Sequence, residues 1–431
     1  MELKEFVKEL ENRNMVKHVR RKVSTKYEIS TLMKLLESET ILFENVDGFN
    51  MPVIANLCPT RKHVAIGLGI KEEQLIPRMI EAINNPKEPE IVDVDYGQQP
   101  VDLSTIPILT YYPFDGGPYI ASGIVIAYDR EYGINASFHR AMVIDRERMV
   151  FRILERDFDA YIKRGLKEFA FCIGNPIPVL LGAAISVPIN INELAIANSL
   201  APIKCTNLDG HVVPLAEIVM LCEFTGEMHD EGPFLDLTET PDIVRKQRVA
   251  KVKKIYFREN PFYHALLPGG LEHKLLMGMP REPTIYIEVG KVCDVKDVYI
   301  TPGGCSWLHA VVSIRKRNAE DGRKAIEAAF RGHHSVKHVF VVDEDIDIHN
   351  PQEVEWAMAT RFQGKEDIIM KEEKGSSLDP SADPKTRMTT KMGFDLTIPF
   401  GHEGKGFKKP ELPLKLDVND YIVREHAKDK A

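Results

Sequence analysis

The apolar positions at the start of the chain follow a helical spacing. They lie one helical turn apart, at Leu3, Phe6, Val7 and Leu10, which predicts an amphipathic helix. A second helix is expected over residues 31–37, and short apolar runs predict strands at 40–43 and 52–55. A proline-rich and acidic segment, 85–91, interrupts this pattern. We therefore predict a small N-terminal α/β domain over residues 1–100.

The middle of the chain has a different pattern. Its apolar runs are short, rich in isoleucine and valine, and separated by turns that contain glycine or proline. This punctuation is typical of a β-barrel or a β-sandwich. We assign residues 101–297 to this β-rich central domain.

After residue 297 the pattern alternates between strand and helix. The predicted elements are a strand at 307–315, a helix at 319–331, a strand at 338–342 and a helix at 351–362. A polar segment rich in turn residues follows at 374–385 and is expected to form a loop. This alternation predicts a C-terminal α/β domain over residues 298–431.

Composition is that of a globular protein. Hydrophobic residues make up 44% and charged residues 28% of the 431 residues, close to the average for folded domains. The net charge of -8 leaves no overall basic footprint for nucleic acid. The most apolar stretch, 177–189, contains two prolines and is shorter than the roughly 20 residues that a membrane helix needs. With no signal-peptide core and no C-x-x-C pair, we expect a cytoplasmic protein with reduced cysteines, no nucleic-acid partner and no membrane association.

One strand-like segment carries an arginine on its apolar face. Residues 135–144 alternate in polarity, so a strand would place Arg140 on the same side as Phe138 and Met142. A buried guanidinium without partners is costly, so Arg140 should meet a carboxylate, a phosphate or a substrate anion. A salt-bridged arginine at the end of a barrel explains the same pattern equally well.

Two carboxylates flank a rigid turn further along the chain. Glu231 and Asp236 bracket a Gly-Pro pair that follows the strand-like run 218–224. If both face a cleft, burial or mutual repulsion raises the pKa of one of them and makes it a proton donor near neutral pH. An exposed acidic loop also explains this spacing. Two more acids interrupt apolar runs: Glu193 suits the first turn of a helix, and Glu217 suits a paired core carboxylate or a ligand.

Several familiar functional motifs are incomplete or absent in this sequence. The acidic run 343–347 resembles a calcium loop, but Ile348 and Val354 stand where such a loop needs glycine and glutamate. Three nearby histidines have no cysteine or acidic partners at zinc-ligand spacing: His333, His334 and His338. The chain has no G-x-x-x-x-G-K phosphate loop and no G-x-S-x-G elbow, which argues against nucleoside-triphosphate hydrolysis and α/β-hydrolase chemistry.

Short motifs spread along nearly the whole chain resemble the UbiD family of prenylated-flavin-dependent reversible decarboxylases. They are Ile41-Leu-Phe-Glu-Asn, Met51-Pro-Val, Val64-Ala-Ile-Gly, Val101-Asp-Leu-Ser-Thr-Ile-Pro-Ile, Pro302-Gly-Gly-Cys-Ser and Lys391-Met-Gly-Phe-Asp. The resemblance implies an N-terminal α/β domain and a central split β-barrel, related to flavin reductases, that holds the cofactor. It also implies a C-terminal α/β domain that assembles oligomers.

The resemblance implies a metal and a flavin site as well. In the family an asparagine, a histidine and a glutamate bind a divalent metal, usually manganese, that bridges to the phosphate of prenylated FMN. Asn135 and Glu193 match the asparagine and the glutamate, whereas the histidine position falls at Glu155 or Arg156. We favour Glu155, which would complete an all-oxygen site for Mn²⁺ or Mg²⁺; Arg156 would instead contact the phosphate. K⁺ is an additional candidate ion. The implied cofactor contacts are Asn135, Ser137, Phe138, His139, Arg156, Ile185, Ser186 and Lys391.

The family's catalytic network matches Glu231, Arg140 and Asp236 position by position. The implied reaction is the non-oxidative decarboxylation of an α,β-unsaturated acid. In it Arg140 holds the carboxylate, Asp236 donates a proton, and Glu231 tunes and relays. The chain is short and looks more like the compact archaeal members, which makes trans-anhydromevalonate 5-phosphate the leading substrate and isopentenyl phosphate the product, in a modified mevalonate pathway.

Two other functions stay open at this point. The first is decarboxylation of an aromatic acid of the 4-hydroxybenzoate or cinnamate type. The second is a non-catalytic, flavin-binding scaffold protein. The expected partners are a flavin prenyltransferase that supplies the cofactor and further copies of the chain, as a dimer or a hexamer. A phosphorylated substrate would need a second basic site, for which His139, Arg156 and Lys391 are candidates.

Overall fold

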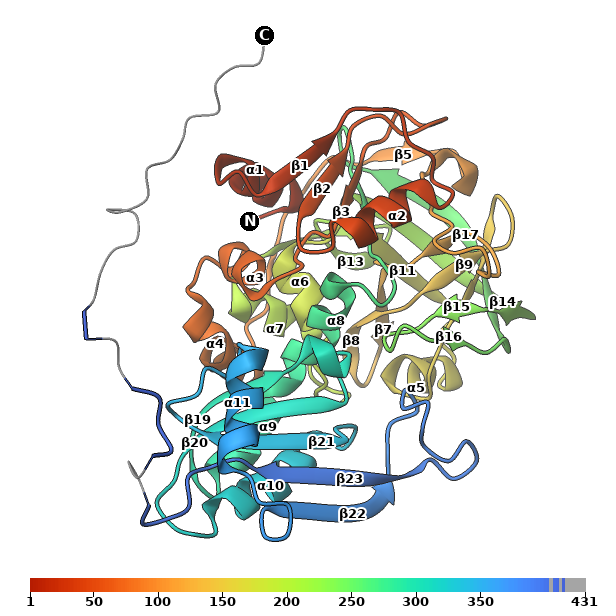
Figure 1. The fold of residues 1–431 in the computed structure, drawn as a ribbon. Helices are drawn as coiled ribbons and strands as arrows, with labels where there is room; N and C mark the ends of the chain where they lie inside the picture. Colours follow the sequence, from red (N-terminus) through yellow and green to blue (C-terminus); the bar gives the residue numbers. More distant parts are fainter. Residues whose placement is uncertain (403–405, 411–412, 415–431) are drawn as a thin grey trace.

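The computed structural model describes residues 1–402, 406–410 and 413–414, and Figure 1 shows its arrangement. The end of the predicted C-terminal domain, residues 415–431, lies outside the described residues. The six cysteines are free thiols. No helix in the described part is long and apolar enough to cross a membrane.

The N-terminal region is a small sheet packed with helices. Its elements are α1 (Leu3–Asn12), β1 (Val16–Val19), α2 (Glu28–Leu35), β2 (Thr40–Phe43), β3 (Val53–Ala55), α3 (Arg61–Leu68) and α4 (Leu75–Asn84). The four apolar residues of α1 that predicted this helix are buried. The fourth strand of the sheet, β18 (Tyr263–Ala265), comes from far along the chain and pairs in parallel with β3.

The central region is dominated by a nine-stranded sheet. Its strands are β5 (Gly97–Gln99), β6 (Tyr119–Ile120), β7 (Ile124–Asp129), β8 (Gly133–Phe138), β9 (Ala141–Val143), β10 (Arg148–Phe151), β11 (Glu168–Ile173), β14 (Ile218–Glu231) and β17 (Arg245–Phe257). Their order is β6-β9-β10-β17-β14-β11-β7-β8, with β5 joined to β17, and neighbouring strands are antiparallel. The β-rich central region is thus present.

This sheet curls back on itself. In the strand order β8 stands at one end and β9 next to the other end, yet only His139 and Arg140 separate them in sequence. Because a residue spans at most about 3.6 Å, the two ends of the sheet must approach each other there. No strand pair among the described residues closes the sheet, so the split-barrel detail stays a prediction. The single strand predicted over 135–144 is wrong, since Arg140 lies in the break between β8 and β9.

Shorter elements surround the sheet. The helices are α5 (Asp157–Lys163), α6 (Ile177–Gly182), α7 (Glu193–Leu200), α8 (Leu271–Gly278) and α9 (Glu282–Gly290). A three-stranded sheet joins β4 (Glu90–Ile91), β12 (Lys204–Leu208) and β13 (His211–Pro214), and a two-stranded sheet joins β15 (Phe234–Leu235) and β16 (Pro241–Asp242). Short 3₁₀ turns lie at Glu72–Gln74, Leu103–Thr105, Met279–Arg281 and Pro302–Gly304.

The C-terminal region is a five-stranded sheet with two helices. Its elements are β19 (Asp294–Ile300), β20 (His309–Arg315), α10 (Asp321–Gly332), β21 (His338–Asp343), α11 (Pro351–Arg361), β22 (Ile368–Lys374) and β23 (Met388–Asp395). The strand order is β19-β20-β21-β23-β22. The four predicted elements between residues 307 and 362 are confirmed, and the predicted polar loop joins β22 to β23. In Figure 1 helices α6, α7 and α8 lie between this sheet and the N-terminal sheet.

Strand β11 of the central sheet is buried on both faces. In β11, Phe169 and Phe171 pack into one hydrophobic core, whereas Ala170 and Cys172 pack into the other. Because successive side chains of a strand point to opposite faces, this alternation of large and small residues places β11 between two cores. Packing against two cores therefore fixes the position of this strand in the sheet.

Candidate active site

The break between β8 and β9 places Arg140 against the end of β14. Arg140 Nε donates to Glu231 Oε1 at 2.8 Å, and its Nη2 donates to Oε2 at 3.1 Å. The Glu231 side chain is 0% exposed and the Arg140 side chain 13%. Tyr119 Oη donates to Glu231 Oε1 at 3.1 Å, and the Phe234 ring centroid lies 5.0 Å from the guanidinium carbon. Burial alone would lower the pKa of Arg140, but the hydrogen bonds to Glu231, together with the negative charges of Glu231 and its neighbouring aspartates, outweigh it and raise this pKa.

A second carboxylate on Arg140 was missed in the sequence. Asp242, on β16, accepts from Arg140 Nη2 at 2.9 Å. It stands opposite Phe234 in the register of the β15–β16 hairpin, which is what brings it to the arginine. Nothing in the local sequence marks Asp242, because its partner Arg140 lies 102 residues away in the chain. We call Arg140, Glu231, Asp242 and Tyr119 the Arg140 network.

Asp236 lies near this network without an ion pair to it. Its Oδ1 accepts from the Leu237 backbone N–H at 2.7 Å, and its charge contributes to the raised pKa of Arg140. The charge of Asp236 also acts to raise the pKa of His273. Burial of His273 has the larger effect and lowers this pKa to about 4. Asp236 is partly exposed, so its carboxylate can reach a bound molecule.

Asn135 and Glu193 meet beside β8. Asn135 Nδ2 donates to Glu193 Oε1 at 3.1 Å, and the Ala136 backbone N–H donates to Oε2 at 2.9 Å. Glu193 opens α7, as its position before an apolar run suggested. Burial raises the pKa of Glu193 to about 7. Asn135 Oδ1 receives one hydrogen bond, from Ser137 Oγ at 3.1 Å, and keeps a second lone pair.

Neither candidate for the third metal ligand joins this pair directly. Glu155 and Arg156 are exposed in the turn before α5, and no hydrogen bond or ion pair in the described residues links Glu155 to Asn135 or Glu193. Asp157 is among the charges that raise the pKa of Glu193, and sequence reasoning did not consider it. No group of three histidine, cysteine or acidic residues with metal-binding geometry occurs in the described part.

His139 links the two halves of the site. Its Nδ1 lies 3.1 Å from the Arg152 carbonyl oxygen and its Nε2 lies 3.1 Å from Ser137 Oγ, while its ring packs on Phe158. Burial lowers the pKa of His139 to about 4, so the ring is neutral at pH 7. Phe138, beside it, is half-buried.

A second cluster of cations lies where α9 approaches the C-terminal sheet. Arg281 Nη2 donates to Ser186 Oγ at 2.6 Å and its guanidinium lies 5.5 Å from the Trp307 ring centroid. Burial, and then the charge of Arg156, lower the pKa of Arg281 to about 10. Burial also lowers the pKa of His333 to about 3, with Arg281 and Lys391 contributing. We call Ser186, Arg281, His333 and Lys391 the Arg281 cluster; Ile185 is buried next to it.

Lys391 is the buried cation of this cluster. It is 1% exposed, its Nζ donates to the His334 carbonyl oxygen at 2.7 Å, and Glu373 lies 3.3 Å from Nζ. Arg281 has no ion pair in the described residues, and both Arg281 Nε and His333 Nε2 are buried without a hydrogen-bond partner. Arg281 carries no local motif that would have marked it in the sequence.

Three family models match consecutive parts of the chain. The N-terminal domain of 3-octaprenyl-4-hydroxybenzoate carboxy-lyase matches residues 7–83, its Rift-related domain matches 84–271, and its C-terminal domain matches 274–396. The chain belongs to the UbiD family. The resemblance seen in the sequence motifs is thereby confirmed, and the chain is a UbiD-type carboxy-lyase. The domain boundaries at 100 and 297 stay predictions.

Relatives of this UbiD-family chain are similar over nearly its whole length. Anhydromevalonate phosphate decarboxylase from Methanothermobacter thermautotrophicus is 41% identical over 402 residues, which cover 89% of this chain and 94% of the relative. The protein of the same name from Methanocaldococcus jannaschii is 41% identical over 415 residues, 91% and 97% of the two chains. The UbiD-class enzyme HmfF from Pelotomaculum thermopropionicum, in complex with FMN, superposes with a TM-score of 0.93 at 33% identity and covers 97% of this chain and 100% of its own.

A UbiD-family cofactor needs a phosphate site, and the Arg281 cluster fits one. Arg281 Nε and His333 Nε2 are buried polar atoms without partners, and such atoms are rare unless a ligand or water satisfies them. The pair of Asn135 and Glu193 offers oxygen ligands of the kind that Mg²⁺ and Mn²⁺ prefer. An evolved dimeric form of HmfF has been solved with prenylated FMN; it is 31% identical to this chain, with a TM-score of 0.88 and a coverage of 98% of this chain and 100% of its own.

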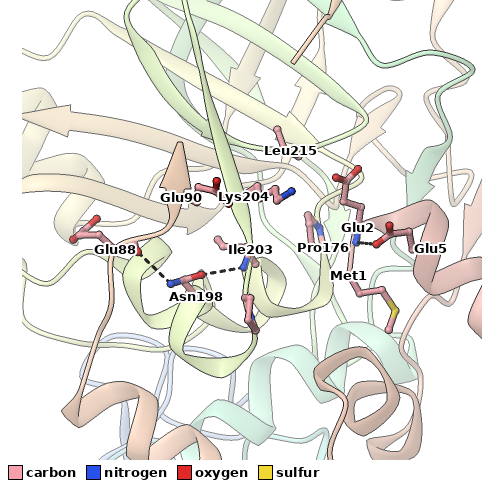
Figure 2. Close-up of a pocket in the computed structure, with 11 residues that line it drawn as sticks. Met1, Glu2, Glu5, Glu88, Glu90, Pro176, Asn198, Ile203, Lys204 and Leu215 are labelled. Atoms are coloured by element: carbon pink, nitrogen blue, oxygen red, sulfur yellow. Dashed lines mark hydrogen bonds between the residues drawn. The ribbon is translucent and has the colours of Figure 1, made fainter. Parts of the chain in front are cut away.

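Other predicted residues have structural roles. Glu217 is buried, pairs with Lys4 at 3.4 Å and accepts from the Phe262 backbone N–H, which holds α1 to the core. Asp343 and Asp345, from the rejected calcium loop, pair with Arg361. A hollow lined by Glu2, Glu88 and Lys204 contains none of the site residues (Figure 2), and its acidic rim does not suit an anionic substrate.

Proposed function

We propose that this chain is a prenylated-FMN-dependent decarboxylase that converts trans-anhydromevalonate 5-phosphate to isopentenyl phosphate and carbon dioxide in a modified mevalonate pathway. The Arg140–Glu231 pair carries this proposal. Glu231 occupies the Nε and Nη2 edge of the guanidinium, and Nη1 donates no hydrogen bond in the described residues. The free donors of a buried arginine suit a substrate carboxylate. The identity of 41% to two anhydromevalonate phosphate decarboxylases supports the choice of substrate.

The residues that would hold the cofactor lie along β8 and in the Arg281 cluster. We assign the phosphate to Arg281, Lys391 and Arg156, and the flavin to Ser137, Phe138, His139, Ile185 and Ser186. Asn135 and Glu193 would bind Mn²⁺ or Mg²⁺, with Glu155 as the proposed third ligand and K⁺ as an additional ion. When bound, prenylated FMN supplies an electron-accepting ring system for the electron pair that departing carbon dioxide leaves behind.

The chain's own residues orient the acid and move the proton. Arg140 fixes the carboxylate, and Glu231 with Asp242 fixes Arg140. Asp236, which has no ion pair in the described residues and is partly exposed, takes up a proton from solvent and, as the neutral acid, donates it to the carbon that has lost carbon dioxide. The buried Phe234 ring excludes water from one face of the guanidinium.

We further propose that the protein is cytoplasmic, forms a homo-oligomer (a dimer or a hexamer), and receives its cofactor from a flavin prenyltransferase. Oligomer formation would use the C-terminal domain. Analytical ultracentrifugation of the cofactor-loaded protein measures its mass, and a monomer at micromolar concentration would contradict this assembly.

Co-expression with a flavin prenyltransferase tests the main proposal. The purified protein should show the absorption of a modified flavin and should release carbon dioxide from trans-anhydromevalonate phosphate. Cinnamate and 4-hydroxybenzoate serve as comparison substrates. A cofactor-loaded protein that decarboxylates only the aromatic acids, or no acid at all, would sink the proposed substrate.

A further inference from the structure

Arg152 is a half-buried cation whose charge is poorly matched. It follows β10, its side chain is 19% exposed, and its one ion-pair contact is from Nε to Asp242 Oδ2 at 3.7 Å. The guanidinium donates no hydrogen bond in the described residues. An arginine carries five N–H donors, and none of those of Arg152 is among the described atoms that are buried without a partner, so they open toward solvent and are free to bind an anion. The arrangement therefore favours a bound anion.

The residues around Arg152 also favour a bound anion at this position. Asp242 Oδ2 also accepts from Arg140 at 2.9 Å and from Arg245 at 2.6 Å, so one carboxylate oxygen faces three guanidiniums. Burial, and then the positive charge of Arg245, lower the pKa of Arg152. The Arg245 side chain is 33% exposed, so both cations remain accessible from solvent.

We propose that Arg152 and Arg245 bind the phosphate of the substrate while Arg140 binds its carboxylate. This inference rests on the proposed function. Arg140 and Arg152 contact the same Asp242 oxygen, so a short acid that carries one anion at each end can reach both. Asp242 is then a positioning residue, because it holds Arg140 and Arg245 in place without touching the reacting carbon.

The basic residues suggested by the sequence suit this phosphate less well. His139 is neutral at pH 7, since burial lowers its pKa to about 4. Lys391 belongs to the Arg281 cluster, which is assigned to the cofactor phosphate, and it is also paired with Glu373. The charge of Arg156 lowers the pKa of Arg281. Arg156 is therefore associated with the Arg281 cluster, which is assigned to the cofactor phosphate. Arg152 and Arg245 are therefore the cations left for the substrate.

The test compares trans-anhydromevalonate phosphate with the same acid lacking its phosphate. In cofactor-loaded Arg152→Gln and Arg245→Gln, kcat/KM for the phosphorylated acid should fall roughly ten- to a hundredfold, the size expected for a lost charge-assisted hydrogen bond. The value for the unphosphorylated acid should fall by a much smaller factor, because that acid loses no contact to either arginine. Arg152→Lys, which keeps the charge, should restore part of the loss.

Matched controls come from the same strands. Arg148, on β10, pairs with Asp145 and Glu227, and Arg248, on β17, pairs with Asp159; Arg148→Gln and Arg248→Gln should leave both substrates unaffected. Flavin absorbance of each variant reports cofactor content. Equal losses with both acids, loss of flavin from Arg152→Gln, or no loss at all would overturn the inference. If the unmodified enzyme turns over neither acid, the proposed function fails, and this inference with it.

Discussion

The Arg140 network and the Arg281 cluster each contain a buried arginine, but only Arg140 is matched by carboxylates in the described residues. Arg140 meets Glu231 and Asp242 within hydrogen-bond distance. Arg281 meets one serine hydroxyl and an aromatic ring, and its Nε has no partner. A compensated arginine is held in one geometry, whereas an uncompensated one is arranged for an anion that binds there.

This difference separates two tasks in the site. The network orients a reacting group, so its geometry must already be correct before substrate arrives. The cluster provides binding energy for a phosphate, and its charge is best left unmatched until the cofactor is present. Variants in the two places should therefore fail in different ways.

The largest effect is expected for Arg140→Ala. Turnover should fall by at least roughly a thousandfold, the scale of losing a preorganised electrostatic contact. Removing one partner of a buried ion pair should also cost about 3–5 kcal/mol of unfolding free energy, because Glu231 keeps a buried charge. Urea unfolding and carbon dioxide release measure the two effects. The double variant Arg140→Met with Glu231→Gln should regain stability and remain inactive; regained turnover would contradict the assigned role.

The next largest effects are expected for substitutions of Asp236 and Asp242, which should change activity and stability in different ways. Asp236→Asn should lower kcat roughly a hundredfold or more, as expected for a lost general acid, with little change in stability, since Asp236 has no ion pair. Asp242→Asn should lower kcat/KM about tenfold and also destabilise the fold, because Arg140 and Arg245 lose a shared partner. Steady-state kinetics and unfolding of the two variants separate these patterns. Equal behaviour of the two would remove the distinction between proton donor and positioning residue.

Arg281→Met should act on the cofactor and leave the network intact. Affinity of the cofactor-free protein for FMN should fall roughly tenfold or more, since a charged hydrogen bond to a phosphate is lost. Stability without cofactor should stay equal or rise slightly, because a partly buried cation without a carboxylate is removed. Fluorescence titration with FMN measures the affinity, with Arg248→Met as the control. An unchanged FMN affinity would exclude Arg281 from the phosphate site.

The smallest effect is the pH dependence contributed by His139. The pKa of His139 is about 4 in the folded protein, below the ordinary histidine value of about 6.5. The unfolded chain therefore binds more protons between these values, so this part of the stability is present above pH 6.5 and is lost as pH falls toward 4. His139→Gln should show a shallower decline between pH 6.5 and 5 in urea unfolding. An identical decline in both proteins would mean that other buried histidines account for it.

The local sequence pattern by itself determined many of the helices and strands and indicated the family. Apolar spacing predicted α1 and the alternating elements between residues 307 and 362, because a helix face or a strand is encoded within a few neighbouring residues. The position of Arg140 on an apolar run indicated a buried cation that needs a carboxylate, a phosphate or a substrate anion as its partner. Motifs along the chain indicated the UbiD family before any fold was seen.

Tertiary structure decided which groups meet. The break between β8 and β9, where the two ends of the central sheet approach each other, turned Arg140 toward Glu231. A two-stranded hairpin then delivered Asp242 to Arg140, where the sequence had suggested Asp236. The partners of three further arginines were likewise visible only in the folded structure: Arg152, Arg245 and Arg281. Charged side chains act over a few ångströms in space, and pairs distant in sequence become neighbours only through strand order, which no local spacing records.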